Sequence, residues 1–255
     1  MAPAADEQGD VYVATGNGHF DAASGGCSYG DSLLKLRLTG SQLVVRDLFT
    51  PPNERDLNAR DKDLGSGGPV LLPARAGQRL VLIAGKEGPL HVLDRDRLKE
   101  GARQSLPLAG GAYAAPAYWN GHVFFAATND RLQDFAVVQG KLSEAPVKSG
   151  GERFANPGAG AVVSANGARD AVVWLIETKV WNDYASTKPS ILRAYDAANV
   201  AREIYDSEQS GARDRAGVTV RFTIPTVANG RVYIGAKREV DVYGLLAPKQ
   251  PTTAK

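Results

Sequence analysis

The chain has 255 residues, of which 43% are hydrophobic and 23% charged, and its formal net charge is +2. This composition is typical of a globular protein, and the nearly balanced charge excludes the strong positive field with which proteins attract nucleic acid or anionic membranes. No apolar run reaches the roughly 18 residues that cross a bilayer, so we expect no membrane span. The 28 glycines and 14 prolines favour a fold rich in turns.

The beginning of the chain and its cysteine content exclude two further features. The first residues, MAPAADE, contain neither a basic segment nor an apolar core, so no signal peptide is predicted in this chain. Cys27 is the only cysteine, which excludes an internal disulfide and a Cys-x-x-Cys-His attachment site for haem. The three histidines are scattered and lack the spacing of metal ligands.

Five units of similar pattern follow one another along the chain. In each unit, short apolar runs alternate with turns rich in glycine, proline, asparagine and aspartate, which favour antiparallel hairpins over helical crossovers. The predicted strands are 10–15, 33–38 and 43–49 in the first unit; 68–72, 80–84 and 90–93 in the second; 114–119, 123–127 and 132–138 in the third; 161–165, 172–176, 191–196 and 202–205 in the fourth; and 223–228, 232–236 and 240–246 in the fifth. We expect little helix, and we interpret the charged run 54–63 as a solvated loop.

Asn-Gly dipeptides mark the same turn in three of these units. They occur at residues 120–121, 166–167 and 229–230, each time between the first and the second predicted strand. Asn-Gly favours the type I′ turn, whose twist matches that of a β-hairpin. The second strands, such as LVLIA at 80–84, are apolar on both faces, so we expect neighbours to cover them on both sides.

Antiparallel sheets of about four strands that repeat radially form a β-propeller. A β-sandwich is the competing all-β fold, but nothing in a sandwich requires the sequence to repeat. We therefore predict an all-β protein, a β-propeller of about five four-stranded blades over residues 1–247, followed by a polar tail at 248–255. Phe125 and Trp174 lie in second strands and are predicted to be buried between blades.

The fifth unit ends before a fourth strand. Two arrangements follow from this observation. Either residues 2–5 supply a strand that helps to close a five-bladed ring, or the chain is an incomplete arc of a larger ring. We expect the fifth unit to lack its outermost strand or to borrow one from the N-terminus.

Several of the repeat segments resemble those of a known family. The segments are GDVYVATGNG, DLGSGGPVLL, AGKEGPLHVLDRD, AYDAANVAREIY and PTVANGRVYIG. In these segments the chain is similar to bacterial propeller proteins with pyrroloquinoline quinone (PQQ)-like repeats, and it resembles the later blades of quinoprotein alcohol dehydrogenases. The resemblance implies a PQQ-like propeller repeat protein, a parent ring of about eight blades, and a periplasmic or secreted location.

The resemblance also implies roles for three residues. Asn17, in VATGNG, matches a turn whose asparagine is a calcium ligand in the dehydrogenases, and calcium prefers such oxygen donors. Asp63, in KDLGSGG, corresponds to the catalytic aspartate, the general base toward an alcohol hydroxyl while calcium polarises the quinone. Lys86, in AGKEG, corresponds to the cation that binds the quinone oxygens and so helps to hold PQQ.

The same positions have simpler interpretations. Lys62 and Leu64 stand where the family has aromatic residues, and the acidic calcium ligand and the adjacent-cysteine disulfide of the dehydrogenases have no match. Asn17 alone cannot hold calcium, which takes about six to eight oxygen ligands. Asn17 can be a loop residue with positive φ, Asp63 a cap on nearby amides, and Lys86 a solvated charge.

Three functions are consistent with the sequence. The preferred one is a non-catalytic binding or assembly scaffold with an unknown protein partner. The alternative is a fragment of a PQQ- and calcium-dependent quinoprotein dehydrogenase that oxidises a small-molecule alcohol or sugar, and the third is a hydrolase or lyase with its site in the central channel. The fold alone does not decide among them.

The order of strands makes a geometric prediction about the three residues. Asn17 and Lys86 follow second strands, whereas Asp63 precedes a first strand. In an antiparallel blade, the end of the second strand lies beside the start of the first. We therefore expect Asn17, Asp63 and Lys86 to converge at one end of neighbouring blades.

Overall fold

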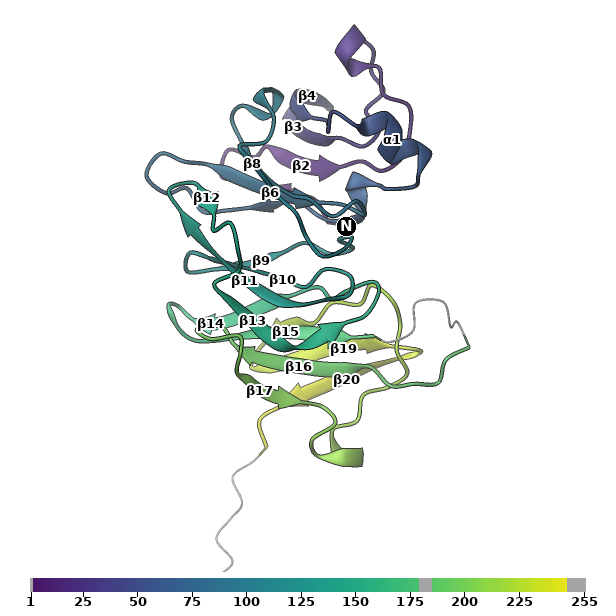
Figure 1. Cartoon of the computed structure of the whole chain (residues 1–255), viewed down its shortest axis with the longest axis vertical. Helices are drawn as coiled ribbons and strands as arrows, with labels where there is room; N and C mark the ends of the chain where they lie inside the picture. The colour runs from purple at the N-terminus through teal and green to yellow at the C-terminus, as the bar shows by residue number, and fades with distance from the viewer. Residues whose placement is uncertain (1, 179–184, 247–255) are drawn as a thin grey trace, which may run out of the picture.

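The computed structural model describes residues 2–178 and 185–246, so the predicted tail at 248–255 lies outside the described residues. The described chain folds into five antiparallel sheets in chain order, which we call blades 1 to 5 (Figure 1). Blade 1 consists of β1 (Ala4–Ala5), β2 (Val11–Ala14), β3 (Leu33–Thr39) and β4 (Gln42–Phe49). Blade 2 consists of β5 (Val70–Leu71), β6 (Leu80–Ala84), β7 (Leu90–Asp94) and β8 (Gln104–Leu106).

The remaining blades differ in their number of strands. Blade 3 has five strands, β9 (Ala117–Trp119), β10 (His122–Phe125), β11 (Asp130–Val138), β12 (Lys141–Leu142) and β13 (Lys148–Phe154). Blade 4 consists of β14 (Val162–Asn166), β15 (Arg169–Glu177), β16 (Ile191–Asp196) and β17 (Glu203–Asp206). Blade 5 has three strands, β18 (Thr226–Ala228), β19 (Arg231–Ala236) and β20 (Glu239–Gly244).

The blades are arranged radially. The first strands of neighbouring blades contact one another, β1 with β5, β9 with β14 and β14 with β18, so they surround a common axis. Four apolar clusters join consecutive blades, from blades 1 and 2 to blades 4 and 5. This packing of sheets around an axis is a β-propeller, as the sequence predicts.

Blades 1 and 5 do not meet as a closed ring requires. No apolar cluster of the described residues joins them, and they lie toward opposite ends of the molecule's long axis (Figure 1). Strand β1 pairs with β2 of its own blade, so residues 2–5 do not complete blade 5. Among the described residues, blade 5 ends with β20 and has no fourth strand.

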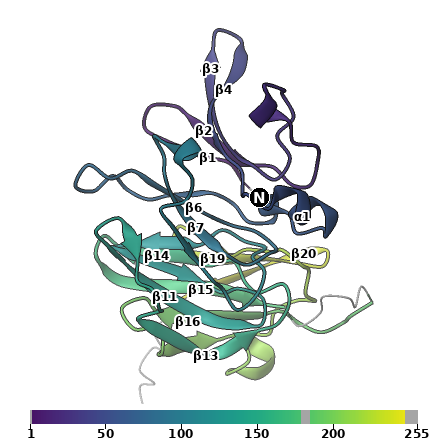
Figure 2. The ribbon, with the colours of Figure 1, turned by 45° about the horizontal axis from the view of Figure 1, so that its top comes forward.

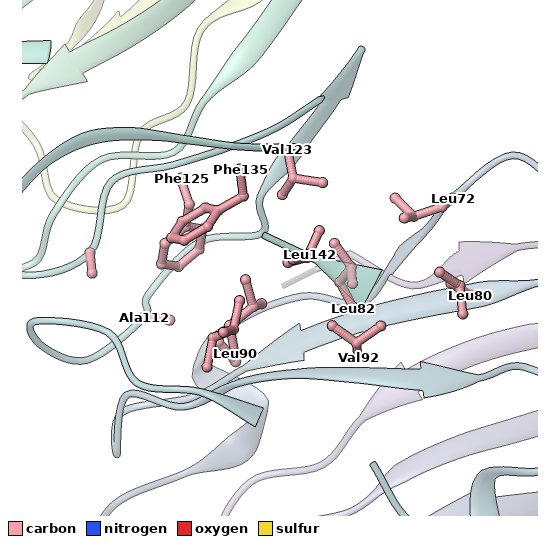
Figure 3. Packing of buried hydrophobic residues seen from close by; sticks show 13 residues of the cluster. Leu72, Leu80, Leu82, Leu90, Val92, Ala112, Val123, Phe125, Phe135 and Leu142 are labelled. Carbon is pink, nitrogen blue, oxygen red and sulfur yellow. The ribbon is translucent and has the colours of Figure 1, made fainter. Parts of the chain in front are cut away.

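The second strands occupy the centre of the packing, as predicted. Every residue of β6 is buried, because β5 and β7 flank it in the sheet while blades 1 and 3 cover its two faces. Figure 3 shows the cluster between blades 2 and 3, where Phe125 is 3% exposed. Trp174 differs from the prediction: it is half-buried at the margin of the cluster between blades 4 and 5, and its Nε1 donates to Ser164 Oγ at 2.8 Å.

Local structure agrees with the turn prediction and corrects the loop prediction. The pairs Asn120-Gly121 and Asn229-Gly230 both have positive φ, as a type I′ turn requires, whereas in the third pair only Gly167 does. Part of the charged run 54–63 forms α1 (Glu54–Ala59), which buries Leu57, so this segment is not wholly a solvated loop. Within the described ranges, no helix has both the length and the apolar character to cross a membrane.

Candidate functional site

Three loops approach one another closely at one end of blades 1 and 2. Asn17 follows β2, Asp63 precedes the 3₁₀ turn Leu64–Ser66 that leads into β5, and Lys86 follows β6. A Cβ atom at Gly65 would lie 2.7 Å from the backbone of Thr15, and one at Gly85 would lie 2.4 Å from the carbonyl oxygen of Asp63. The loops can come this close only because both positions are glycine.

The convergence expected from the strand order is present. Asp63 Oδ1 accepts the backbone N–H of Asn17 at 2.9 Å, and Asp63 Oδ2 pairs with the ammonium of Lys86. Asp61, which the sequence did not single out, joins them: its Oδ1 lies 2.9 Å from Lys86 Nζ and accepts Asn17 Nδ2 at 2.9 Å. We call Asn17, Asp61, Asp63 and Lys86 the axial cluster. The enzymatic roles that the resemblance implies for three of them stay predictions.

The charges of the axial cluster stabilise one another. Burial by itself lowers the pKa of Lys86, but its hydrogen bonds to Asp63 and Asp61 outweigh burial and raise that pKa above its usual value. Lys86 in turn lowers the pKa of the Asp61 carboxyl. Lys86 is therefore an ammonium, and Asp61 a carboxylate, at neutral pH.

A buried carboxyl group next to the axial cluster holds the turn that follows Asp63. Asp31 is fully buried, and its Oδ1 accepts the backbone N–H of Leu64 at 2.9 Å, which fixes the turn after Asp63. Its Oδ2 has no hydrogen-bond partner among the described residues, and burial raises the pKa of this carboxyl. Asp31 therefore positions Asp63 through the backbone.

These residues do not fit a calcium ion. The space between the carboxylates of Asp61 and Asp63 is taken by the ammonium of Lys86, and Asn17 turns two N–H donors toward them. Calcium needs about six to eight oxygen ligands. In the described chain, no group of three or more histidine, cysteine, aspartate or glutamate side chains could hold a metal ion. The cation of this site is supplied by the protein itself.

An open hollow of about 630 Å³ lies beside the axial cluster. It is lined by Arg60, Asp61, Lys62, Gly65, Ser66, Lys86, Tyr113 and Phe222. The rings of Tyr113 and Phe222 stack with centroids 6.0 Å apart, and Phe222 is 53% exposed. The hollow thus combines three basic side chains and one acidic side chain with two stacked aromatic rings.

Phe222 has an uncommon backbone conformation. Its φ is +63°, in the left-handed region that a bulky side chain rarely adopts. Such residues concentrate at functional sites, where the surrounding structure holds them in place. Neither Phe222 nor Tyr113 has a sequence signal that marks it, because each comes from a loop of a different blade. Asp61 could have been found, since it lies two residues before Asp63.

Comparisons with known proteins give the fold. No family model matches the chain, and no curated protein is significantly similar to it. Among solved structures, BamB from Moraxella catarrhalis aligns with a TM-score of 0.50 at 13% identity over 91% of this chain and 57% of that one. The Cps50 (Swd1) β-propeller domain of Myceliophteria thermophila aligns with a TM-score of 0.54 at 10% identity, over 100% of this chain and 68% of that one. At these identities the likeness shows the β-propeller fold alone.

Proposed function

We propose that this chain is a non-catalytic β-propeller scaffold that binds its partner at the open hollow beside the axial cluster. The observation that carries the proposal is the position of Lys86, whose ammonium pairs with both Asp61 and Asp63. A propeller presents loops of several blades at each end of its axis, and here loops of different blades enclose one open hollow. Concave sites of this kind, with a few polar groups beside apolar ones, are where ligands bind.

The contacts of Asp63 oppose a role as general base. A general base needs an oxygen within hydrogen-bond reach of the proton that it removes. Both oxygens of Asp63 are already engaged, one by the Asn17 N–H and the other by Lys86.

The lining of the hollow indicates the chemistry of the ligand. Arg60, Lys62 and Lys86 favour an anionic group, although Arg60 is also paired with Asp56 and Lys86 with Asp63. Tyr113 and Phe222 favour a planar or apolar group beside it. We propose an anionic ligand with an adjacent planar part, carried by a small molecule or by acidic and aromatic side chains of a protein partner.

A PQQ- and calcium-dependent dehydrogenase acting on an alcohol or sugar is the second candidate. One observation favours it: Asn17, Asp63 and Lys86 meet as the resemblance requires. The poor fit of calcium and the presence of Lys62 and Leu64 in place of aromatic residues oppose it.

A titration with PQQ separates the two candidates, because PQQ is itself a planar tricarboxylate. The scaffold proposal predicts weak binding that calcium does not change, that added salt weakens, and that is accompanied by no reduction of an artificial electron acceptor by simple alcohols. Tight, calcium-dependent binding with turnover, lost in Asp63→Ala, would establish the dehydrogenase. Failure to bind PQQ at all would refute the proposed ligand class.

Two variants test whether binding takes place in the hollow. Lys62→Glu reverses an exposed charge of the lining and is expected to weaken PQQ binding about tenfold, which corresponds to about 1.4 kcal/mol. Lys99→Glu changes the same kind of exposed side chain on blade 2, outside the lining, and is the matched control. Equal effects of the two substitutions would show that the overall charge, and not the hollow, governs binding.

A further inference from the structure

The two end blades each have a sheet face that packs against no neighbouring blade in the described chain, whereas the other blades bury both faces. We call the face that packs against the preceding blade the leading face, and the face that packs against the next blade the trailing face. Within the chain, each of the four apolar clusters consists of a trailing face against a leading face. The leading face of blade 1 and the trailing face of blade 5 belong to none of these clusters.

The leading faces share a position in the repeat. In blades 2 to 5, two alternate residues of the second strand contact the preceding blade, and all of them are at most 5% exposed. These pairs are Val81 and Ile83, Val123 and Phe125, Val173 and Leu175, and Val232 and Ile234. The repeat thus places a buried apolar pair here whenever a blade precedes.

Blade 1 has the same pair, and among the described residues no blade precedes it. Its second strand, in GDVYVAT, offers Val11 and Val13, at the positions that Val232 and Ile234 occupy in GRVYIGA. Tyr12 packs toward blade 2, so strand alternation turns Val11 and Val13 to the opposite face, where they are only partly buried. The leading face of blade 1 is therefore built as an interface and lacks its partner within the described chain.

The paired residues of the leading face of blade 1 are all apolar, and Arg46 is the unpaired residue at the bulge of β4. By alternation and strand pairing these paired residues are Ala5, Val11, Val13, Leu34, Leu36, Leu38, Leu43, Val45 and Leu48. Leu38 and Leu43 are a cross-strand pair, 62% and 63% exposed, near the tip of the β3–β4 hairpin that projects away from the other blades (Figure 2). A continuous apolar sheet face of this kind marks an interaction surface.

The trailing face of blade 5 has the matching pattern. Tyr233 occupies the position of Tyr12, Leu82, Phe124 and Trp174, which contribute to the clusters on the trailing faces of blades 1 to 4. Val240 and Val242 lie beside Tyr233 on this face and are 65% and 50% exposed. Arg231 is its charged residue and stands at the end of the face, so the centre is apolar.

We propose that the chain associates head to tail, with the leading face of blade 1 packed on the trailing face of blade 5 of a second copy. The contact continues the packing of the four internal interfaces, because it joins the same two kinds of face at the same positions of the repeat. None of the paired residues at the centre of either face is charged. Such a heterologous contact either closes a ring of copies or extends it.

Sedimentation velocity over a range of concentrations tests the contact. The wild-type chain is expected to exceed the mass of one chain and to grow with concentration. Three substitutions are each expected to weaken association at least about tenfold. They are Leu36→Glu at the centre of the blade 1 face, the milder Leu38→Glu at its exposed end, and Val242→Glu on blade 5. Val138→Glu is the matched control, since Val138 is 57% exposed on blade 3 and lies on neither face. Circular dichroism verifies that each variant is folded.

Mixing two variants decides between a head-to-tail contact and a symmetric one. Leu38→Glu keeps the blade 5 face intact and Val242→Glu keeps the blade 1 face intact, so an equimolar mixture has one functional junction and is expected to form dimers. Association that only the blade 1 variants weaken would show a symmetric contact and overturn the proposal. A wild-type chain that stays monomeric, or association that Val138→Glu weakens equally, would overturn it as well.

Discussion

The interface between blades 2 and 3 and the interface between blades 1 and 2 are built in different ways. Between blades 2 and 3, a large cluster of leucine, valine and phenylalanine side chains fills the space (Figure 3), and Gln104 exchanges hydrogen bonds with the backbone of Leu142 at its margin. Between blades 1 and 2, a smaller apolar cluster lies between two groups of charges. One group is the axial cluster. The other consists of Asp10, Lys35 and Arg37, and Lys35 donates from it to the backbone carbonyl of Arg95 in blade 2.

The difference shows which part of the molecule each kind of contact serves. Apolar burial is non-directional and supplies most of the cohesion between blades. Charged groups that are buried contribute little net stability but are costly to leave unpaired, so they fix one arrangement of the loops. The site of the proposed function therefore lies at the interface whose geometry is fixed by charge.

The largest effect is expected at the apolar interface. Phe125→Ala removes an aromatic ring from the cluster between blades 2 and 3 and should lower the free energy of unfolding by about 3–5 kcal/mol, because it leaves a cavity. A urea titration measures this change. Trp174→Ala is the comparison and should cost less, since Trp174 is half-buried. A loss below about 1 kcal/mol for Phe125→Ala would contradict the packing described for this interface.

A smaller effect is expected for the charges between blades 1 and 2. Asp10 is 1% exposed and accepts hydrogen bonds from Arg37, and its Oδ2 lies 3.3 Å from Lys35 Nζ. Asp10→Asn should lower the free energy of unfolding by about 3 kcal/mol, because it removes the buried carboxylate that pairs with both Arg37 and Lys35 and leaves Asp96 as the carboxylate beside Lys35. The control is Asp56→Asn, whose exposed pair with Arg60 should matter by less than about 1 kcal/mol.

The contribution of Asp10 should depend on pH. Its hydrogen bond to Arg37 holds the pKa of the Asp10 carboxyl below its ordinary value of 3.8. The unfolded chain therefore takes up the proton at higher pH than the folded chain, and the stabilisation is complete above the ordinary value and lost as pH falls through the folded pKa. Unfolding titrations should show the difference between wild type and Asp10→Asn shrinking below about pH 3.8; a difference that stays constant would contradict the ion pair.

The smallest effect is expected from His91, whose ring meets Phe49 of blade 1 edge-on with centroids 5.2 Å apart. Burial lowers the pKa of His91 below 6.5, so the unfolded chain binds the proton first as pH falls. Stability should therefore decrease slightly as pH falls below 6.5, and His91→Gln should remove this slope. Thermal unfolding at several pH values checks the prediction; an unchanged slope in the variant would assign it to another group.

The sequence predicts the parts of the fold that depend on local pattern. Asn120-Gly121 and Asn229-Gly230 adopt the predicted turns, and the apolar run of β6 is buried on both faces. Strand β13, with the sequence KSGGERF, has no alternation to reveal it and pairs because β11 offers a long edge. The α-helix at Glu54–Ala59 is short, and its buried Leu57 is its single apolar anchor toward the core.

The candidate site was predictable only in part. The strand order places Asn17, Asp63 and Lys86 at one end because antiparallel pairing fixes which loops meet. The partners that define the chemistry of the site were not visible in this way. Phe222 reaches Tyr113 from another blade through a tertiary contact that no spacing in the sequence encodes, whereas Asp61, which also pairs with Lys86, lies only two residues before Asp63.

The central claim is that Lys86 supplies the cation of the axial cluster, so that no calcium ion is bound there. A calcium titration of the wild-type chain, followed by the amide signal of Asn17 in a ¹H–¹⁵N spectrum, tests it most directly. Since the Asn17 N–H donates to Asp63 Oδ1, any ion that displaces Lys86 must shift this signal. We expect no shift at calcium concentrations up to the millimolar range. A saturable shift at micromolar calcium that disappears in Asp63→Ala would contradict the account and favour the dehydrogenase.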